Sequence, residues 1–401
     1  MNIDSAVNKK AIHTISCVDG LLFWIFCTVY LAIFQGEMLT MMMKVYFPDR
    51  LLYNPWAGAL LITAVLNLVQ WGICRLFFFS KKLMALSYIP SFLLLSAFTN
   101  VNNTFYQGYS LSVLSLLSLG LIAVFLFVMK MREEIVYSQR ESKGSLLKFI
   151  NINLLLMSLL CLFSVSMANT DENFHHELSV EVAISNADYE RAMNIGRQSL
   201  TTSRELTALR ALALSRANQL GERFFEYPQL FGIEGLLLSN QAARTTFFTS
   251  DSLQIYLGGS REQHENVIDY LYRISTQPEA YLSSKEYYRI ALLLDKKLSD
   301  FYQSISNDSV DINLRPKHFA EALTLYRHLH PELLLASMNE DMETRFAAFL
   351  QLQSEYASPL EQENRIRREY GNTYWYYYYY FASNHFSANG GHCNPAPERI
   401  P

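Results

Sequence analysis

Five long apolar runs in the first 168 residues constrain the fold of this chain more than any other feature of its sequence. A helix needs roughly 20 mostly apolar residues to cross a hydrocarbon layer of about 30 Å. The runs therefore predict a transmembrane domain over residues 1–168. The third run is the shortest and contains Pro90, which predicts either a kink or a re-entrant turn. The predicted spans are 17–36, 56–79, 83–100, 109–129 and 146–168.

The charge composition changes where these apolar runs end. Residues 1–168 contain 12 basic and 7 acidic side chains, a net charge of +5. The chain has 33 Lys and Arg and 37 Asp and Glu, so residues 169–401 carry 21 and 30, a net charge of −9. This change is typical of a membrane domain followed by a water-soluble domain. The acidic balance also argues against a nucleic-acid partner, because phosphate binding requires clustered Lys and Arg.

Basic residues between the predicted spans indicate an orientation. Lys9 and Lys10 precede the first span, Lys81 and Lys82 separate the second from the third, and five more basic residues separate the fourth from the fifth. The alternate loops carry fewer basic residues. Because such residues collect on the cytoplasmic side, we expect a bacterial inner-membrane protein with a cytoplasmic N-terminus and a periplasmic C-terminal domain.

Polar residues recur on one face of two predicted spans, and no Asp, Glu or His lies in the middle of a span. An intramembrane polar face that includes Asn67 and Gln70 has two readings, a lined pathway or hydrogen-bonded helix packing. Packing is the favoured reading. The two faces are Thr63, Asn67, Gln70 and Cys74, and Asn153, Met157, Cys161 and Ser164.

Residues 169–382 have the helical pattern throughout, with apolar residues recurring every three or four positions. Asn186 and Ser203 are expected to begin helices that run to Leu200 and Gln219. Many short helices with short connections predict an all-α fold in which an irregular α-solenoid follows the transmembrane helices. Residues 383–401 are rich in Gly, Asn and Pro and predict a flexible tail.

Three of these helical segments resemble tetratricopeptide repeats. "DYERAMNIGRQSL" (Asp188–Leu200) and "HFAEALTLYRHLHP" (His318–Pro331) are similar to the second helix of such a repeat, and "LRALALSRANQLGE" (Leu209–Glu222) resembles a first helix with its Gly turn. Gly196 departs from the pattern, and residues 228–315 do not follow a 34-residue period. The whole chain also resembles an uncharacterised family of Bacteroides-type envelope membrane proteins, which implies no particular activity.

No catalytic, metal or cofactor signature occurs in the sequence. Nucleotide-binding, hydrolase and zinc-protease motifs are absent, and the Cys and His residues lack metal-ligand spacing. The predicted function is therefore non-catalytic, with the helical repeats presenting a surface to a protein partner in the envelope. The alternative is a membrane enzyme or carrier for a lipid-linked glycan, with Glu37 and Asp49 as catalytic acids and the Asn67 and Gln70 face completing its site.

The stretch "GNTYWYYYYYF" (residues 371–381) closes the soluble domain with consecutive aromatic rings. A helix that begins near Pro359 and runs toward Phe381, with a possible break at Gly371, would direct these rings to all sides. We expect Tyr374, Tyr377 and Tyr378 to pack inward against the last repeat. The rings expected to face a partner or the membrane surface are Trp375, Tyr376, Tyr379 and Tyr380.

Overall fold

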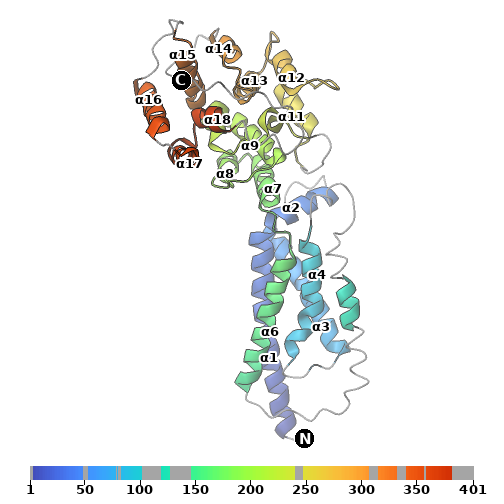
Figure 1. The fold of residues 1–401 in the computed structure, drawn as a ribbon. Helices are drawn as coiled ribbons and strands as arrows, with labels where there is room; N and C mark the ends of the chain where they lie inside the picture. The colour runs from blue at the N-terminus through green and yellow to red at the C-terminus, as the bar shows by residue number, and fades with distance from the viewer. Residues whose placement is uncertain are drawn as a thin grey trace. The chain divides into compact units, whose positions relative to one another are not determined.

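The structure is a computed structural model that divides into two compact units, Met1–Leu178 and Ser179–Pro401, described separately below (Figure 1). It describes residues 3–47, 53–77, 79, 83–101, 119–126, 146–239, 247–306, 315–331, 340–355 and 358–381. Throughout these residues the regular structure is helical and no strand is present. The boundary between the units lies within helix α7 (Glu172–Ser185), whereas the sequence placed it after residue 168.

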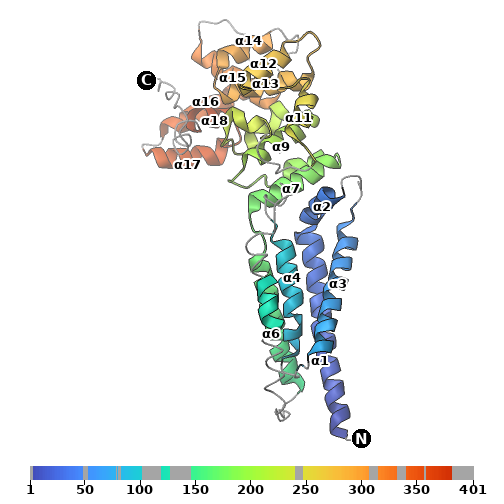
Figure 2. The same cartoon turned by 90° about the vertical axis from the view of Figure 1, so that its right-hand side faces the viewer.

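The first unit is a bundle in which α1, α3, α4 and α6 lie side by side (Figures 1 and 2). α1 packs against α3 and α6, and α4 packs against the same two helices. The bounds are α1 (Ile3–Val29), a π-helical turn (Tyr30–Phe34), α2 (Gly36–Tyr46), α3 (Pro55–Leu76), a 3₁₀ turn (Met84–Tyr88), α4 (Ile89–Thr99) and α6 (Leu146–Met167).

Within the described residues, three helices are long and apolar enough to cross a membrane, not the five predicted. They are His13–Phe34, Pro55–Leu76 and Leu146–Met167, and they indicate membrane association. The predicted third span is a shorter apolar helix, Met84–Thr99, which at 1.5 Å per residue reaches only about 24 Å. Of the predicted fourth span, only residues 119–126 are described, and they are helical.

Pro90, for which the sequence predicts a kink or a re-entrant turn, lies at the start of a helix. It occupies the first turn of α4, where a proline is tolerated because the first amides of a helix have no acceptor within it. The 3₁₀ turn Met84–Tyr88 is therefore followed directly by α4, and Pro90 favours the start of that helix.

The second unit is built around three helices. α9 and α15 are buried over most of their length, and α13 is buried over its C-terminal half. The bounds are α8 (Tyr189–Asn194), α9 (Arg204–Arg216), α10 (Leu220–Arg223), α11 (Ser250–Leu257), α12 (Val267–Ser275), α13 (Leu282–Leu294), α14 (Leu298–Ser306), α15 (Lys317–Leu329), α16 (Glu340–Glu355), α17 (Pro359–Tyr370) and α18 (Tyr374–Tyr380), with 3₁₀ turns at Phe224–Glu226 and Gly232–Leu236.

The first repeat-like segment is shorter than predicted. The residue that caps the start of helix α8 is Asp188, not Asn186, because the Asp188 carboxylate accepts a hydrogen bond from the Arg191 amide at 3.1 Å. The helix ends at Asn194, and Gly196 follows with a φ of 58°. The predicted start at Ser203 is confirmed, since its hydroxyl accepts from the Leu206 amide at 3.0 Å.

Gly221 joins parts of the second unit that are distant in sequence. A Cβ atom there would lie 2.9 Å from both Phe319 and Pro316, so only glycine lets α10 approach the start of α15. The sequence had assigned Gly221 to a turn after the helix, but α9 ends earlier and Gly221 lies inside α10. A purely linear array would not need this close contact.

Candidate functional site

The acidic pair of the enzyme hypothesis is not assembled in the described residues. Glu37 lies half-buried in the first turn of α2, and Asp49 lies outside the described residues. An apolar groove of about 650 Å³ runs along α1 and α6, lined by residues such as Phe26, Tyr30 and Leu154. Glu37 does not line this groove.

The predicted polar face of α3 points into the bundle at Gln70. The Gln70 side-chain amide donates to the Ser87 hydroxyl at 3.0 Å and to the Cys74 sulfur at 3.1 Å. Asn67 is half-buried one turn away. On α6, the Asn153 side-chain oxygen accepts from the Ala85 amide at 2.8 Å. Gln70 and Asn153 therefore hydrogen-bond their helices to the Met84–Tyr88 turn, as is common where helices pack in a membrane.

The tyrosine segment forms its own short helix, α18, after a break at residues 371–373. Trp375 has no exposed surface and Tyr376 is buried, so the prediction that both would face outward is wrong. Tyr374 and Tyr377 are buried as predicted, whereas Tyr378 is only half-buried. Tyr379 and Tyr380, also predicted to face outward, are half-buried too.

Four other elements surround α18, three of them with aromatic rings, and for this reason several of its faces are buried. Phe225 of the Phe224–Glu226 turn lies 5.1 Å from the rings of Tyr374 and Tyr377. On another side, Phe346 and Phe349 of α16 lie 5.0 and 5.8 Å from Trp375. The remaining contacts come from Tyr370 of α17 and from α15.

Two tyrosine hydroxyls of α18 bond to the C-terminal end of α13. Tyr374 Oη donates to the Leu293 carbonyl oxygen at 3.1 Å, and Tyr377 Oη donates to the Leu294 carbonyl oxygen at 2.9 Å. The last carbonyls of a helix lack partners within the helix, and these hydroxyls bond to two of them, although the Leu293 oxygen also accepts from the Lys296 amide at 3.2 Å. Burial raises the pKa of both hydroxyls, which keeps them protonated as donors.

Glu321 of α15 fixes the other end of α18. Its Oε2 accepts from the Tyr374 amide at 2.8 Å and from His318 Nδ1 at 2.9 Å. His318 Nε2 in turn accepts from the Phe225 amide at 3.2 Å, which assigns the ring proton to Nδ1 in a neutral imidazole. Glu321 and His318 have no exposed side-chain surface, so this network is internal to the core.

Lys296 completes the attachment of α18. Its Nζ donates to the Tyr378 carbonyl oxygen at 2.5 Å and lies 5.1 Å from the centre of the Tyr378 ring. Burial lowers the pKa of Lys296 to about 8. The tyrosines therefore close the core of the second unit and bond its helices together.

A different part of the second unit exposes apolar surface. Ile255 of α11 is 75% exposed, and Tyr281 and Leu282 at the start of α13 are 57% and 62% exposed. Tyr281 packs on Gly258, where a Cβ would lie 2.9 Å from its ring, and Gly258 is one turn from Ile255 on the same side of α11. We call these three residues, Ile255, Tyr281 and Leu282, the α11–α13 patch.

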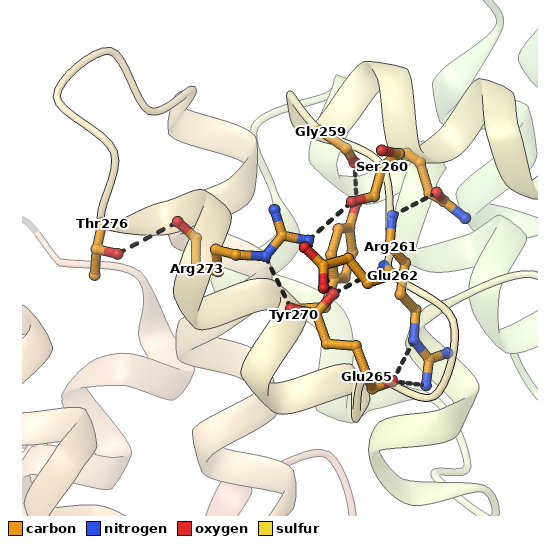
Figure 3. A network of polar contacts seen from close by, with 9 residues as sticks. Gly259, Ser260, Arg261, Glu262, Glu265, Tyr270, Arg273 and Thr276 are labelled. Atoms are coloured by element: carbon orange, nitrogen blue, oxygen red, sulfur yellow. Dashed lines mark hydrogen bonds and ion pairs between the residues drawn. The ribbon is translucent and has the colours of Figure 1, made fainter.

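The loop that follows α11 is bridged by an ion pair between Glu265 and Arg273 (Figure 3). Glu265 accepts from Arg273 Nε at 2.9 Å and from an Arg273 terminal nitrogen at 2.8 Å. These bonds lower the pKa of Glu265. The same terminal nitrogen of Arg273 also donates to the Ser260 carbonyl oxygen at 2.9 Å. The Tyr270 hydroxyl donates to the Gly259 carbonyl oxygen at 2.7 Å.

Acidic side chains flank the α11–α13 patch. Asp251 precedes Ile255 by one helical turn and is exposed, and Glu279 is exposed two residues before Tyr281. Lys285 is an exposed cation one turn after Leu282. The three apolar side chains of the patch therefore have a mainly acidic border.

This patch was not predicted from the sequence, because its three residues fit an ordinary helical pattern. Residue spacing along α11 does place Ile255 on the opposite side of the helix from the buried Leu253 and Leu257. Asp19 was not singled out either; it lies at the edge of the predicted first span but is buried in the structure.

Comparison with known proteins identifies a family. The chain matches the model of a family of unknown function, DUF6057, over residues 102–260 and 259–381. These segments cover well over half of the chain, and the chain belongs to this family. No curated protein and no solved structure matches it.

Proposed function

We propose that this member of the family is a membrane-anchored interaction protein that binds a protein partner through the α11–α13 patch. The observation that carries the proposal is the exposure of Ile255, Tyr281 and Leu282 beside a loop held by the Glu265–Arg273 ion pair. A rigid, partly apolar surface binds with little loss of conformational entropy.

The partner is a protein segment with apolar side chains next to Lys or Arg. Asp251 and Glu279 would attract such a segment and raise its rate of association. The same charges disfavour an anionic lipid surface, and they disfavour the patch of a second copy, because two acidic borders repel one another.

Residue placement supports a C-terminal unit on the side of the membrane opposite to the N-terminus. Among the described residues, three helices are long and apolar enough to cross, and three crossings, like the five predicted from the sequence, would place the two ends of the chain on opposite sides. Lys9 and Lys10 precede the first of them, which favours a cytoplasmic N-terminus and a periplasmic binding unit. Reporter fusions after residue 381 test this orientation, and activity of a cytoplasm-specific reporter there would contradict it.

Site-specific photocrosslinking in intact membranes tests the binding surface. A photoreactive residue replaces Ile255, Tyr281 or Leu282 in the full chain, and in control chains it replaces Leu200 or Leu360, which are 68% and 69% exposed elsewhere in the same unit. We expect one shared protein adduct from the three patch positions and none from the controls.

Charge reversal shows whether the adduct depends on the acidic border. Asp251→Lys and Glu279→Lys should reduce the shared adduct several-fold, whereas Glu190→Lys, a change at an exposed acid of α8, should leave it unchanged. Equal adducts at patch and control positions, adducts to lipid alone, or an adduct that ignores charge reversal would each contradict the proposal.

A further inference from the structure

Asp19 is an acidic residue inside the membrane unit. The sequence placed it at the start of a span, but α1 begins at Ile3 and the apolar segment begins at His13. Asp19 is therefore six residues inside that segment, roughly 9 Å along the helix axis. Its side chain is 1% exposed.

The side of α1 that carries Asp19 faces the interior of the bundle. Ile15, Asp19, Phe23 and Cys27 recur at intervals of four, and all four are buried. The Phe23 ring lies 4.9 Å from the ring of Tyr88, in the 3₁₀ turn before α4. A Cβ on Gly20 would lie 3.3 Å from the Tyr88 hydroxyl, so Tyr88 packs directly beside the Asp19 position.

The Asp19 carboxyl lacks a compensating cation in the described part of the chain. Its Oδ2 is buried and has no hydrogen-bond partner there, and no ion pair to it is present among the described residues. Most buried charges in proteins are paired, because an isolated carboxylate in an apolar interior costs several kcal/mol. An unpaired acid inside a membrane unit is therefore neutral or bound to a cation.

The other titratable groups that the structure describes near this position do not supply a positive charge from within the bundle. They are the Tyr88 hydroxyl, the Cys74 thiol of α3, and the exposed Cys17 and His13 of α1, which bond to each other at 3.5 Å. α6 contributes the apolar Phe149 to this end of the bundle, while Arg75 of α3 and Lys148 of α6 are exposed on the outside.

We propose that Asp19 is a proton-binding site of the membrane unit. The carboxyl holds a proton while α1 packs against the turn that carries Tyr88. Loss of that proton leaves a carboxylate that must gain water or a cation, so deprotonation favours separation of α1 from this turn. The unit thereby responds to proton concentration through one residue, independently of any partner bound by the second unit.

Reaction with dicyclohexylcarbodiimide tests the protonation state. This apolar reagent adds across a protonated carboxyl and, after acyl transfer, leaves an N-acylurea that contains every atom of both reactants. The full chain in detergent is treated at about pH 5 and about pH 9, values on either side of the range in which a buried acid ionises. We expect the peptide with Asp19 to gain one reagent mass, several-fold more at the lower pH.

Variants and ions complete the experiment. Asp19→Asn should abolish the modification and Asp19→Glu should retain it, with Glu37 in the same sample as the internal control outside the apolar segment. Absence of modification at Asp19, or modification that does not change with pH, would overturn the proposal. Protection by sodium ions at constant pH would also overturn it, because the site would then bind a metal cation.

A stability measurement separates proton binding from simple reactivity. Asp19→Asn keeps the size and neutrality of the protonated acid, so it should fold like the wild type at about pH 5. The melting temperature of the wild type should then fall further between about pH 5 and about pH 9 than that of Asp19→Asn. Equal pH dependence of the two proteins would contradict the proposal, and the modification assay decides it if the variant does not fold.

Discussion

The indole N–H of Trp375 donates a hydrogen bond of 2.8 Å to the main-chain carbonyl oxygen of Glu321. The carboxylate of the same Glu321 accepts from the Tyr374 amide, so one residue of α15 holds two consecutive residues of α18. This relationship orients the tyrosine helix and determines which of its rings are buried.

Replacement of Trp375 by Phe should destabilise the second unit. It removes the bond to Glu321 and leaves part of the indole volume empty, for an expected loss of about 1–3 kcal/mol. Hydrogen exchange of the full chain should show faster exchange in α15 and α18. Trp56→Phe is the control, because Trp56 is exposed on α3 and its side chain fills no core; an equal effect of both changes would refute the packing argument.

Removal of the tyrosine hydroxyls should destabilise the protein selectively. Tyr374→Phe and Tyr377→Phe each remove a bond to the end of α13, and each should lower the free energy of unfolding by about 1 kcal/mol. Tyr376→Phe should have little effect, because the Tyr376 hydroxyl makes no hydrogen bond within the described residues. Denaturant titration of the three variants measures this, and three similar losses would argue against the hydroxyls as helix caps.

The pH dependence of stability should have a maximum set by Lys296 and the tyrosines. Burial lowers the Lys296 pKa from 10.5 to about 8, so between these values the unfolded chain binds more protons and stability rises with pH. The raised pKa of Tyr374 has the opposite sign, and its contribution is lost as the pH rises above 10.0. In melting curves over this pH range, Lys296→Met should remove the rise of stability with pH and leave its fall above pH 10.0 unchanged. A rise that persists in this variant would mean that a group other than Lys296 causes it.

Gly221→Ala should disrupt the approach of α10 to α15. The added Cβ would lie 2.9 Å from Phe319 and from Pro316, and overpacking of this kind costs about 1–3 kcal/mol. Gly72→Ala in α3 is the matched control, since no atom lies within 4 Å of its Cβ position. Thermal unfolding of both variants checks this, and a stable Gly221→Ala protein would show that α15 can shift.

The loop after α11 should lose its order when its ion pair is removed. Glu265→Gln weakens the paired bonds from Arg273, which is partly exposed, and should cost the loop about 1 kcal/mol, or roughly fivefold faster amide exchange over residues 260–266. Since Arg273 lowers the Glu265 pKa below 4.5, the wild-type loop should lose the same protection only as acid protonates Glu265. Exchange unchanged at pH 7 would show that the other loop bonds suffice.

The helical class was predictable from local information. Apolar periodicity, the cap at Ser203 and the long apolar runs all act within a few turns of chain, so the helices α1, α3, α6, α9 and α15 follow from it. Short segments were less predictable. α8 stops early at Asn194, because Gly196 takes a positive φ in the following turn.

The environment of each tyrosine was not predictable from spacing. The predicted orientation of the rings required a helix with one packed face, and such a helix would have exposed Trp375. In the structure, Phe225 and Phe349 are far apart in sequence but contact different sides of α18. More than one face of this helix is therefore buried.

The sequence by itself determined that this chain is helical and that an apolar first part precedes an acidic second part, because both depend on composition and short-range periodicity. Only the tertiary structure decided that the tyrosines close a core, that Asp19 faces the interior of the bundle and that Ile255 stays exposed. Burial depends on which distant segments meet, and the pattern of one helix specifies which sides are apolar but not what covers them.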